Sequence, residues 1–328
     1  MECPECGYVL EPFEKTCTRC ERQATLQGHQ AHHMHQSSSV HSPKLQREES
    51  PPAPSTAWRG WAFFIAGILV LGALICFRTG DGKIFYIRNS GVEGGKLYSI
   101  SPDGSVRREL TNGDNKDQWP SPNSNGKKIA YISWPSDNSE LWVMNSKGSD
   151  ATVILPGKIC SQPAWCPNGQ QIVLLISNGQ GEGSEVVLFE ASAHKFLQLT
   201  HGANASSPSV SPDGQQIVYI DKGNVMLVSA TGKIHRQLSD AGSDSCPRFA
   251  PDGQQIDFLR DGKIFRISLH KKEPRQFYAF TESIANFSWS PNGHLLCLQS
   301  VDNAIYVVNP AGKYCKYLDI GHDPTWSR

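Results

Sequence analysis

Residues 208–220 read Pro-Ser-Val-Ser-Pro-Asp-Gly-Gln-Gln-Ile-Val-Tyr-Ile, and this short stretch decides the fold. Its Pro212-Asp213-Gly214 step favours a tight reversal, because proline presets φ, aspartate bonds back to the backbone and glycine accepts a positive φ. The apolar run at 217–220 is too short for a helix and is rich in β-branched and aromatic residues, which indicates a strand. The stretch therefore predicts two antiparallel strands joined by a tight turn.

The same turn recurs at a regular interval along the C-terminal part of the chain. Its copies are SPNSNG from Ser121, CPNG from Cys166, SPDG from Ser211, APDG from Ala250 and SPNG from Ser290. Their glycines are separated by 43, 45, 39 and 40 residues, and a period of about 40 to 45 residues is typical of four-stranded propeller blades. Each repeat supplies a small twisted sheet that cannot bury both faces alone, and radial stacking of such sheets buries them.

The two ends of this region complete one another. The chain finishes with residues 324–328, Pro-Thr-Trp-Ser-Arg, which match the first strand of a repeat with nothing after it. Residues 81–87, Asp-Gly-Lys-Ile-Phe-Tyr-Ile, match a second strand with nothing before it. We therefore predict an all-β, six-bladed β-propeller over residues 79–328, in which the C-terminal strand closes the first blade.

Two positions depart from the repeat pattern. The SPDG that begins at Ser101 falls between the third and fourth strands of its repeat rather than between the first and second. In the repeat around Trp119, Pro120 stands where the other first strands carry an apolar residue, and the turn that begins at Ser121 has two extra residues. We expect a local distortion of this blade.

The repeats resemble those of TolB-type propellers, which are WD-repeat-like modules with the pattern Pro-x-aromatic-Ser-Pro-Asp-Gly, an apolar strand and a late Leu-Thr. The late pair is present as Leu110-Thr111 and Leu199-Thr200, and the resemblance covers about 250 of the 328 residues. It implies a binding scaffold, since such propellers are mostly bacterial binding proteins, many of them in the cell envelope. Some precede a hydrolase domain; because this chain ends where its ring closes, we expect none here.

Four of the ten cysteines lie near the N-terminus and form two Cys-x-x-Cys pairs, Cys3 with Cys6 and Cys17 with Cys20. Two such pairs supply four thiolates for a tetrahedral metal ion. Residues 1–20 resemble the short zinc ribbons at the start of many bacterial membrane proteins, and this resemblance implies a structural Zn²⁺ site. Two disulfides or a redox pair are the alternatives for the same four residues.

A linker and an apolar segment separate the cysteine pairs from the repeats. Residues 21–57 are rich in Gln, His, Ser and Pro, so we expect a disordered linker that cannot bury enough surface to offset its ordering entropy. Residues 61–77 form an uncharged apolar run between Arg59 and Arg78. At about 1.5 Å per residue this run spans roughly 26 Å as a helix, near the thickness of the hydrocarbon core. We predict one transmembrane helix over residues 58–78; a buried core helix is the alternative.

The orientation of this helix depends on opposing signals. The lysine and arginine counts on its two sides do not favour a cytoplasmic N-terminus, whereas zinc thiolates do because they persist in a reducing compartment. We predict a cytoplasmic N-terminus and a periplasmic or extracellular propeller. The propeller cysteines argue the other way because they have no paired spacing, and we interpret them mostly as small buried residues. They are Cys160, Cys166, Cys246, Cys297 and Cys315.

Charge and motifs narrow the function. Lysine plus arginine total 31 and aspartate plus glutamate total 31, a balance that argues against nucleic acid as a partner. The sequence contains no Gly-x-Ser-x-Gly elbow, Walker loop or His-Glu-x-x-His helix, so we predict no enzyme activity. The propeller histidines, His322 among them, lie singly at turns and strand ends and are expected to be solvated.

The leading hypothesis is a non-catalytic, membrane-anchored propeller that binds a protein or cell-wall ligand at one end of its funnel, with a cytoplasmic protein as the partner of the zinc ribbon. One alternative is a transmembrane sensor that relays ligand binding to that cytoplasmic partner. The other is a glycan-active enzyme that uses the funnel. Several His, Asp or Glu residues converging near the axis would favour the enzyme, whereas an apolar, aromatic rim would favour binding.

Overall fold

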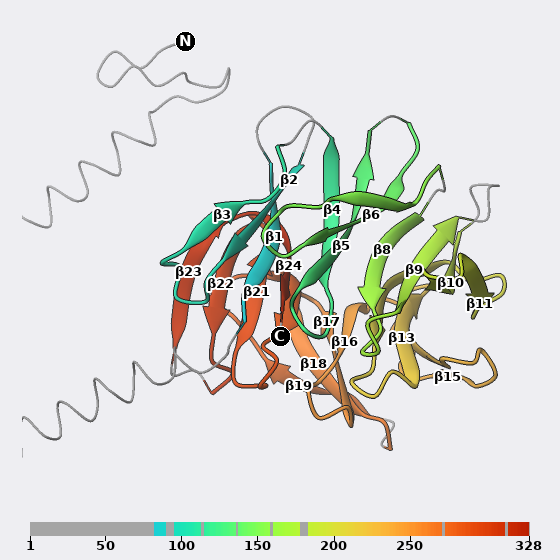
Figure 1. Ribbon diagram of the computed structural model, residues 1–328. Coiled ribbons are helices and arrows are strands. Elements are labelled where there is room, and N and C mark those ends of the chain that lie inside the picture. The colour runs from blue at the N-terminus through green and yellow to red at the C-terminus, as the bar shows by residue number, and fades with distance from the viewer. Residues whose placement is uncertain are drawn as a thin grey trace, which may run out of the picture. The chain divides into compact units, whose positions relative to one another are not determined.

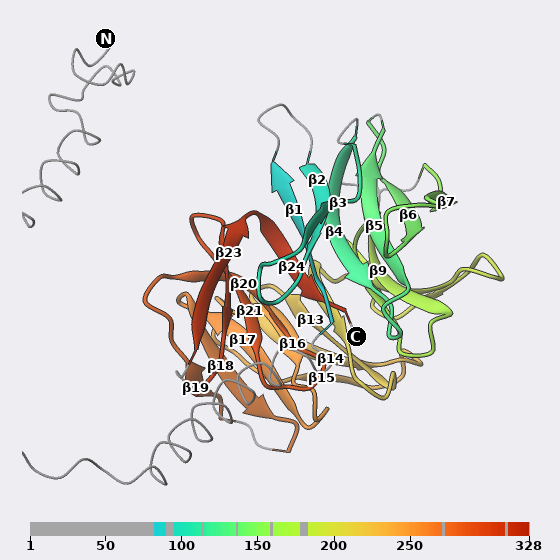
Figure 2. The ribbon, with the colours of Figure 1, turned by 60° about the vertical axis from the view of Figure 1, so that its left-hand side comes forward.

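The computed structural model describes residues 82–327, apart from 90–94, 113–114, 136, 158–159, 178–182, 271–272 and 312–313. Over the described residues the chain forms strands β1 to β24 in six four-stranded antiparallel sheets, which surround a common centre (Figure 1). A view turned by 60° shows the same ring from another side (Figure 2). The predicted all-β, six-bladed propeller is confirmed.

We number the six sheets as blades 1 to 6 along the chain and give their strands from the innermost outward. Blade 1 contains β24 (His322–Trp326), β1 (Ile84–Asn89), β2 (Gly95–Ile100) and β3 (Arg107–Glu109); blade 2 contains β4 (Lys116–Pro122), β5 (Lys128–Trp134), β6 (Glu140–Asn145) and β7 (Thr152–Leu155); blade 3 contains β8 (Cys160–Trp165), β9 (Gln171–Ser177), β10 (Ser184–Glu190) and β11 (Lys195–Gln198). Blade 4 contains β12 (Ala205–Val210), β13 (Gln216–Asp221), β14 (Asn224–Ser229) and β15 (His235–Gln237); blade 5 contains β16 (Ser245–Phe249), β17 (Gln255–Arg260), β18 (Lys263–Ser268) and β19 (Arg275–Tyr278); blade 6 contains β20 (Ile284–Trp289), β21 (Leu296–Ser300), β22 (Ala304–Val308) and β23 (Cys315–Ile320).

The core lies between the blades. In β13, residues 217–220 are all buried, although successive side chains of a strand point to opposite faces of its sheet. Ile217 and Tyr219 pack toward blade 3, whereas Val218 and Ile220 pack against Phe249 and its neighbours in blade 5. Both faces of the second strand are therefore covered, which explains why its sequence is a continuous apolar run rather than an alternating one.

The C-terminal strand closes the ring as predicted. β24 pairs antiparallel with β1, with Ile84 opposite Trp326 and Phe85 opposite Thr325, and the two strands lie side by side in both views (Figures 1 and 2). The pairing continues beyond the strand, because Ser327 N donates to Lys83 O at 2.8 Å. Blade 1 is thus built from the two ends of the repeat region.

The Ser-Pro-Asp-Gly turn has the structure that its residue types favour. Gly214 N donates to Ser211 O at 2.9 Å, and Gly214 has a φ of 74°. The Asp213 carboxylate accepts hydrogen bonds from Ser211 Oγ at 2.6 Å and from Gln215 N at 2.9 Å. These bonds satisfy the backbone of the reversal, which joins the first and second strands of blade 4. The copy at Ser101 instead joins β2 to β3, as its position in the sequence predicts.

The expected distortion around Trp119 was wrong. Asn123 accepts a hydrogen bond from Gly126 N at 2.9 Å, so the turn of blade 2 spans residues 123–126 and has the same length as the others. Ser121 belongs to β4 and pairs with Ala130. The two supposedly extra residues are the end of the first strand. The Ser-Pro-Asn letters at 121–123 imitate the start of a turn, and the interpretation of the sequence was therefore two residues out of register.

The late Leu-Thr pairs tie the third strand of a blade to its outer edge. In blade 3, Val186 N donates to Thr200 Oγ1 at 2.9 Å, and the same hydroxyl donates to Glu185 Oε2 at 2.6 Å. In blade 1, Leu97 N donates to Thr111 Oγ1 at 3.0 Å. A hydroxyl therefore satisfies a backbone N–H where the fourth strand ends, which gives the threonine of the repeat a structural reason.

The predicted zinc ribbon (1–20), linker (21–57) and transmembrane helix (58–78) lie outside the described residues. Within the part of the chain that the structure describes, no helix has the length and apolar character needed to cross a bilayer.

Candidate binding site in the central channel

The innermost strands of all six blades line a central cavity of about 390 Å³. Its walls are built mainly from serine, proline, alanine, glutamine and asparagine side chains, with Arg248 and Asp323 as the charged residues recorded in the lining. Because each blade contributes its first strand, the cavity follows the axis of the propeller.

A repeated backbone irregularity shapes these walls. In five blades the residue before the first-strand proline has a φ between 48° and 54°. These residues are Trp119, Gln162, Ser207, Cys246 and Asp323. The pairing between first and second strand shifts at the same place, for example between Ser206 and Ser209 in β12. Such a bulge bends a strand and redirects its side chains, so it places polar residues on the channel wall instead of within the ladder.

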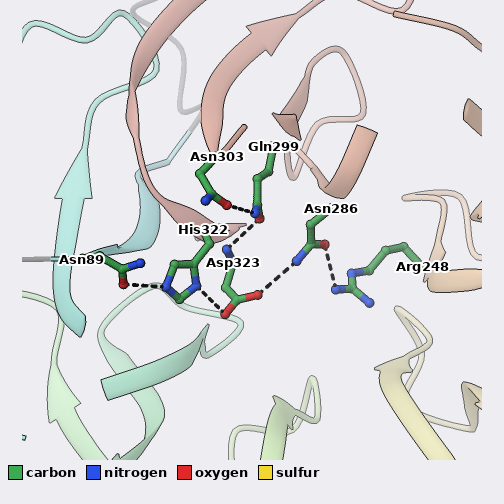
Figure 3. A network of polar contacts seen from close by, with 7 residues as sticks. All are labelled: Asn89, Arg248, Asn286, Gln299, Asn303, His322 and Asp323. Atoms are coloured by element: carbon green, nitrogen blue, oxygen red, sulfur yellow. Dashed lines mark hydrogen bonds and ion pairs between the residues drawn. The ribbon is translucent and has the colours of Figure 1, made fainter. Parts of the chain in front are cut away.

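A polar network crosses the wall between blades 1, 5 and 6 (Figure 3). Arg248 Nη2 donates to Asn286 Oδ1 at 3.4 Å, and Asn286 Nδ2 donates to Asp323 Oδ1 at 3.3 Å. The other oxygen of Asp323 is 3.0 Å from His322 Nδ1, and His322 Nε2 is 3.2 Å from Asn89 Oδ1. Residues of three blades thus share one chain of hydrogen bonds.

Gln299 holds the backbone of Asp323, a member of this network, in place. Its Oε1 accepts a hydrogen bond from Asp323 N at 3.0 Å, and its Nε2 donates to Asn303 Oδ1 at 2.9 Å (Figure 3). Gln299 is buried, so these bonds also satisfy a polar side chain that has left water. The position of Asp323 in the channel is therefore set from blade 6 as well as from its own strand.

A second hollow, of about 210 Å³, lies at the turn ends of the same first strands. Its lining contains prolines of the turns or of the strand ends, large side chains that end those strands, and serine and asparagine residues of the turns. We call the prolines and the large side chains the proline-aromatic rim. The rim consists of Pro122, Pro167, Pro212, Pro251 and Pro291 with Trp165, Val210, Phe249, Trp289 and Trp326. The indole N–H groups of Trp165 and Trp326 are buried and have no hydrogen-bond partner among the described residues. Aromatic side chains on the rim are the feature that favours binding.

Neighbouring turns of the rim pack on one another. A side chain added at Gly293 would meet Pro251 at 3.3 Å, and one added at Gly214 would meet Pro167 at a similar distance. In blades 4, 5 and 6 the turn glycine therefore lies against the turn proline of the preceding blade. This packing holds the turns at fixed spacing around the axis and gives the rim a rigid base.

The propeller cysteines occupy two kinds of environment. Cys160, Cys166 and Cys297 are buried as interpreted, and burial raises the pKa of the Cys160 and Cys166 thiols to about 11. Cys315 is exposed and is the exception to this interpretation. Cys246 is half-buried on the channel wall, and burial raises its pKa as well, which keeps the thiol protonated at neutral pH.

Among the sequence-based site residues, the four predicted zinc ligands lie outside the described part of the chain. Within the described part, no group of three His, Cys, Asp or Glu side chains is placed to hold a metal ion. His322 was expected to be solvated, and this was wrong because it bridges Asn89 and Asp323. Arg248 and Asn286 were missed. They lie in different blades, and nothing in either local sequence indicates that they meet.

The ring closure, the repeated turns and the channel define a six-bladed β-propeller closed by its own C-terminal strand. The chain belongs to the TolB beta propeller domain family, whose family model matches residues 78–244, just over half of the chain. A TolB homolog of Chlorobium luteolum is 27% identical over 141 residues, which are 43% of this chain and 31% of that protein. The uncharacterized peptidase YuxL of Bacillus subtilis is 24% identical over 161 residues, 38% of this chain and 24% of that protein.

The solved structures agree on the fold. TolB from Acinetobacter baumannii superposes with a TM-score of 0.63 at 18% identity, over 76% of this chain and 68% of that one. The chain thus spans about a quarter to a third of the length of the two sequence relatives, one of which is described as a peptidase. These likenesses define the architecture and leave the activity to be argued from the site.

Proposed function

We propose that the protein is a membrane-anchored, non-catalytic binding protein whose propeller binds a protein or cell-wall ligand at the proline-aromatic rim of its channel. The rim is the observation that carries this proposal. Flat proline and aromatic surfaces held on a rigid ring offer contact area at a low cost in side-chain entropy.

The channel chemistry supports binding over glycan cleavage. Hydrolysis of a glycosidic bond needs a pair of carboxyl groups, one acting as the acid and the other as base or nucleophile. In the lining that the structure describes, Asp323 is the one carboxylate, and both of its oxygens are engaged by His322 and Asn286. The Cys246 thiol is protonated and is therefore a poor nucleophile.

The N-terminal half of the proposal rests on the sequence. We propose a structural Zn²⁺ bound by Cys3, Cys6, Cys17 and Cys20 in the cytoplasm, followed by one membrane-spanning helix at 58–78, with the propeller outside. A transmembrane sensor is the second candidate, because a ribbon that binds a cytoplasmic protein would be joined to the ligand site through one chain.

Metal content tests the ribbon. Purified full-length protein should contain one zinc ion per chain, and replacing all four cysteines by serine should remove it. The matched control replaces Cys160, Cys166, Cys246 and Cys315 and should keep the metal. A zinc-free wild type, or loss of zinc in the control variant, would contradict the assignment.

Photocrosslinking tests the binding site. The full chain, produced in cells, carries a benzophenone amino acid either at Pro251, which is exposed on the rim, or at Lys195, which is exposed on the outer strand β11. We expect a discrete protein adduct, or attachment to cell-wall material, from position 251 and none from position 195. Equal labelling at both positions, or no adduct at 251, would refute binding at the rim.

A further inference from the structure

We propose that Arg248 is the anchor for a carboxylate group of the ligand that enters the central channel. This inference rests on the binding function proposed above and adds the chemical class of the group that is bound. The Arg248 side chain lies on the channel wall.

Arg248 has no acidic partner among the ion pairs of the described residues, although a paired arginine lies nearby in the same blade. Arg266 forms a bidentate pair with Asp257, with N–O distances of 2.6 and 2.8 Å. The recorded acceptors of Arg248 are neutral: Pro247 O at 2.9 Å and Asn286 Oδ1 at 3.4 Å. A guanidinium has five N–H donors, so donors remain for an additional acceptor.

The surroundings of Arg248 favour an anion over a neutral acceptor. Arg248 is the one cationic side chain in the cavity lining that the structure describes, and the walls beside it are largely neutral serine, proline and alanine. A carboxylate bound in a narrow channel forms charge-assisted hydrogen bonds and is less screened than at an open surface. A cavity of about 390 Å³ accommodates a segment of a few residues.

Asp323 sets the strength of this site. Asn286 lies between the two charged groups, donating to Asp323 and accepting from Arg248 (Figure 3). The Asp323 carboxylate is thus held near the guanidinium without forming an ion pair with it, and its charge opposes an incoming anion. Replacing Asp323 by asparagine is sterically mild, because asparagine also tolerates the φ of 54° at this position.

The test uses the full chain in detergent micelles and two probes, N-acetyl-trialanine with a free carboxylate and the same peptide as its amide. Binding is measured by calorimetry and by the Nε–Hε signal of Arg248 in the NMR spectrum, assigned through its loss in R248Q. The free acid should bind and shift that signal, and the amide should bind roughly ten- to hundredfold more weakly. R248Q should lose the difference between the probes.

Two further variants complete the test. R275Q removes an exposed arginine of β19 outside the channel lining and should leave binding of the free acid unchanged. D323N should tighten it severalfold, because a repelling charge is removed. Equal binding of acid and amide, no shift of the Arg248 signal at millimolar free acid, or unchanged discrimination in R248Q would overturn the proposal.

The same variants separate this proposal from the one on which it rests. Wild type and R248Q are each crosslinked in cells from position 251. Adducts formed equally by both would overturn the carboxylate anchor and leave binding at the rim intact. Weaker adducts from R248Q, with R275Q unchanged, would support the anchor. Absence of adducts from the wild type would refute the binding function itself.

Discussion

Two interfaces between blades each contain an aspartate that is bonded to arginine. They are the interface between blades 6 and 1, which closes the ring, and the interface between blades 5 and 6. At the closing interface, Asp319 of blade 6 accepts hydrogen bonds from Tyr86 Oη and, at 2.9 Å, from Arg107 Nη1 of blade 1. Between blades 5 and 6, fully buried Asp257 pairs with Arg266 of its own blade and accepts from Trp289 Nε1 at 2.9 Å.

The two carboxylates differ in how far their partners have left water. Burial alone would raise the pKa of Asp319, but hydrogen bonds from Tyr86, from its neighbouring backbone N–H and from Arg107 hold the pKa below its ordinary value. Burial raises the pKa of Asp257, although Arg266 and Trp289 oppose the shift. At the closing interface the surroundings thus favour the charged form of Asp319. At the interface between blades 5 and 6, burial disfavours the charged form of Asp257, and Arg266 and Trp289 compensate for this in part.

Removing the closing strand should have the largest effect. A chain that lacks residues 321–328 loses the pairing of β24 with β1 and the buried side chain of Trp326. Loss of a buried tryptophan side chain alone costs about 3–5 kcal/mol, so we expect no cooperative thermal unfolding of the propeller by circular dichroism. Removal of Arg328 alone is the control. A truncated chain with the melting curve of the wild type would show that pairing with β24 is dispensable.

Asp257→Ala should come next. It leaves the guanidinium of Arg266 largely buried without its acid, and such a change costs about 3–5 kcal/mol of unfolding free energy. Urea unfolding measures the loss. The double variant D257A/R266M removes the stranded charge and should recover most of the stability. If the double variant is no better than D257A, the loss comes from packing and not from the unpaired charge.

Asp319→Asn should be milder, although it breaks the contact that joins the two ends of the ring. Arg107 and Arg88 keep 47% and 40% of their side-chain surface exposed, so water can replace the lost acid. We expect a loss of about 1–2 kcal/mol in the same urea experiment. A loss equal to that of D257A would contradict the distinction between the two interfaces.

The pH dependence of stability should show the smallest effect, with opposite signs at the two sites. The pKa of Asp319 is lowered in the folded state, so this residue stabilises the fold at pH values above its unfolded pKa of about 3.9. That stabilisation is lost as the pH falls through the folded pKa, and D319N should therefore weaken acid destabilisation. The pKa of Asp257 is raised in the folded state, so its protonated form stabilises the fold at pH values below the unfolded pKa. That stabilisation is lost as the pH rises through the folded pKa. An asparagine at 257 should remove that decline. Unfolding free energies measured from pH 3 to pH 7 give both slopes, and slopes of equal sign would refute the assignment.

The fold was predictable because its signals are local and repeated. A turn with a fixed chemistry returns every 40 to 45 residues, and the two incomplete repeats at 81–87 and 324–328 can only be completed by each other. The one error of register arose at Ser121, where a strand ends in letters that imitate the turn. The hydrogen bonds distinguish the end of the strand from the turn, whereas the residue types alone do not.

The channel was less predictable, for two physical reasons. A residue before proline normally favours extended backbone, so nothing in the varied residues at 119, 162, 207, 246 and 323 indicates a left-handed conformation. The polar network also joins Arg248, Asn286 and Asp323 from three blades, and its register depends on the completed ring. The rim was easier to predict from the sequence, because its prolines and aromatic residues belong to the repeat itself.

Ring closure by β24 has a consequence for synthesis. A ribosome releases the chain from its N-terminus, so β1 emerges before β24, and its inner edge has no partner until blades 2 to 6 have been translated. Blades 2 to 6 can each form from continuous sequence, but blade 1 cannot. An interrupted message therefore yields an open ring with an unpaired strand edge, which is a substrate for chaperones and proteases. Only a chain translated through β24 can cover that edge of β1.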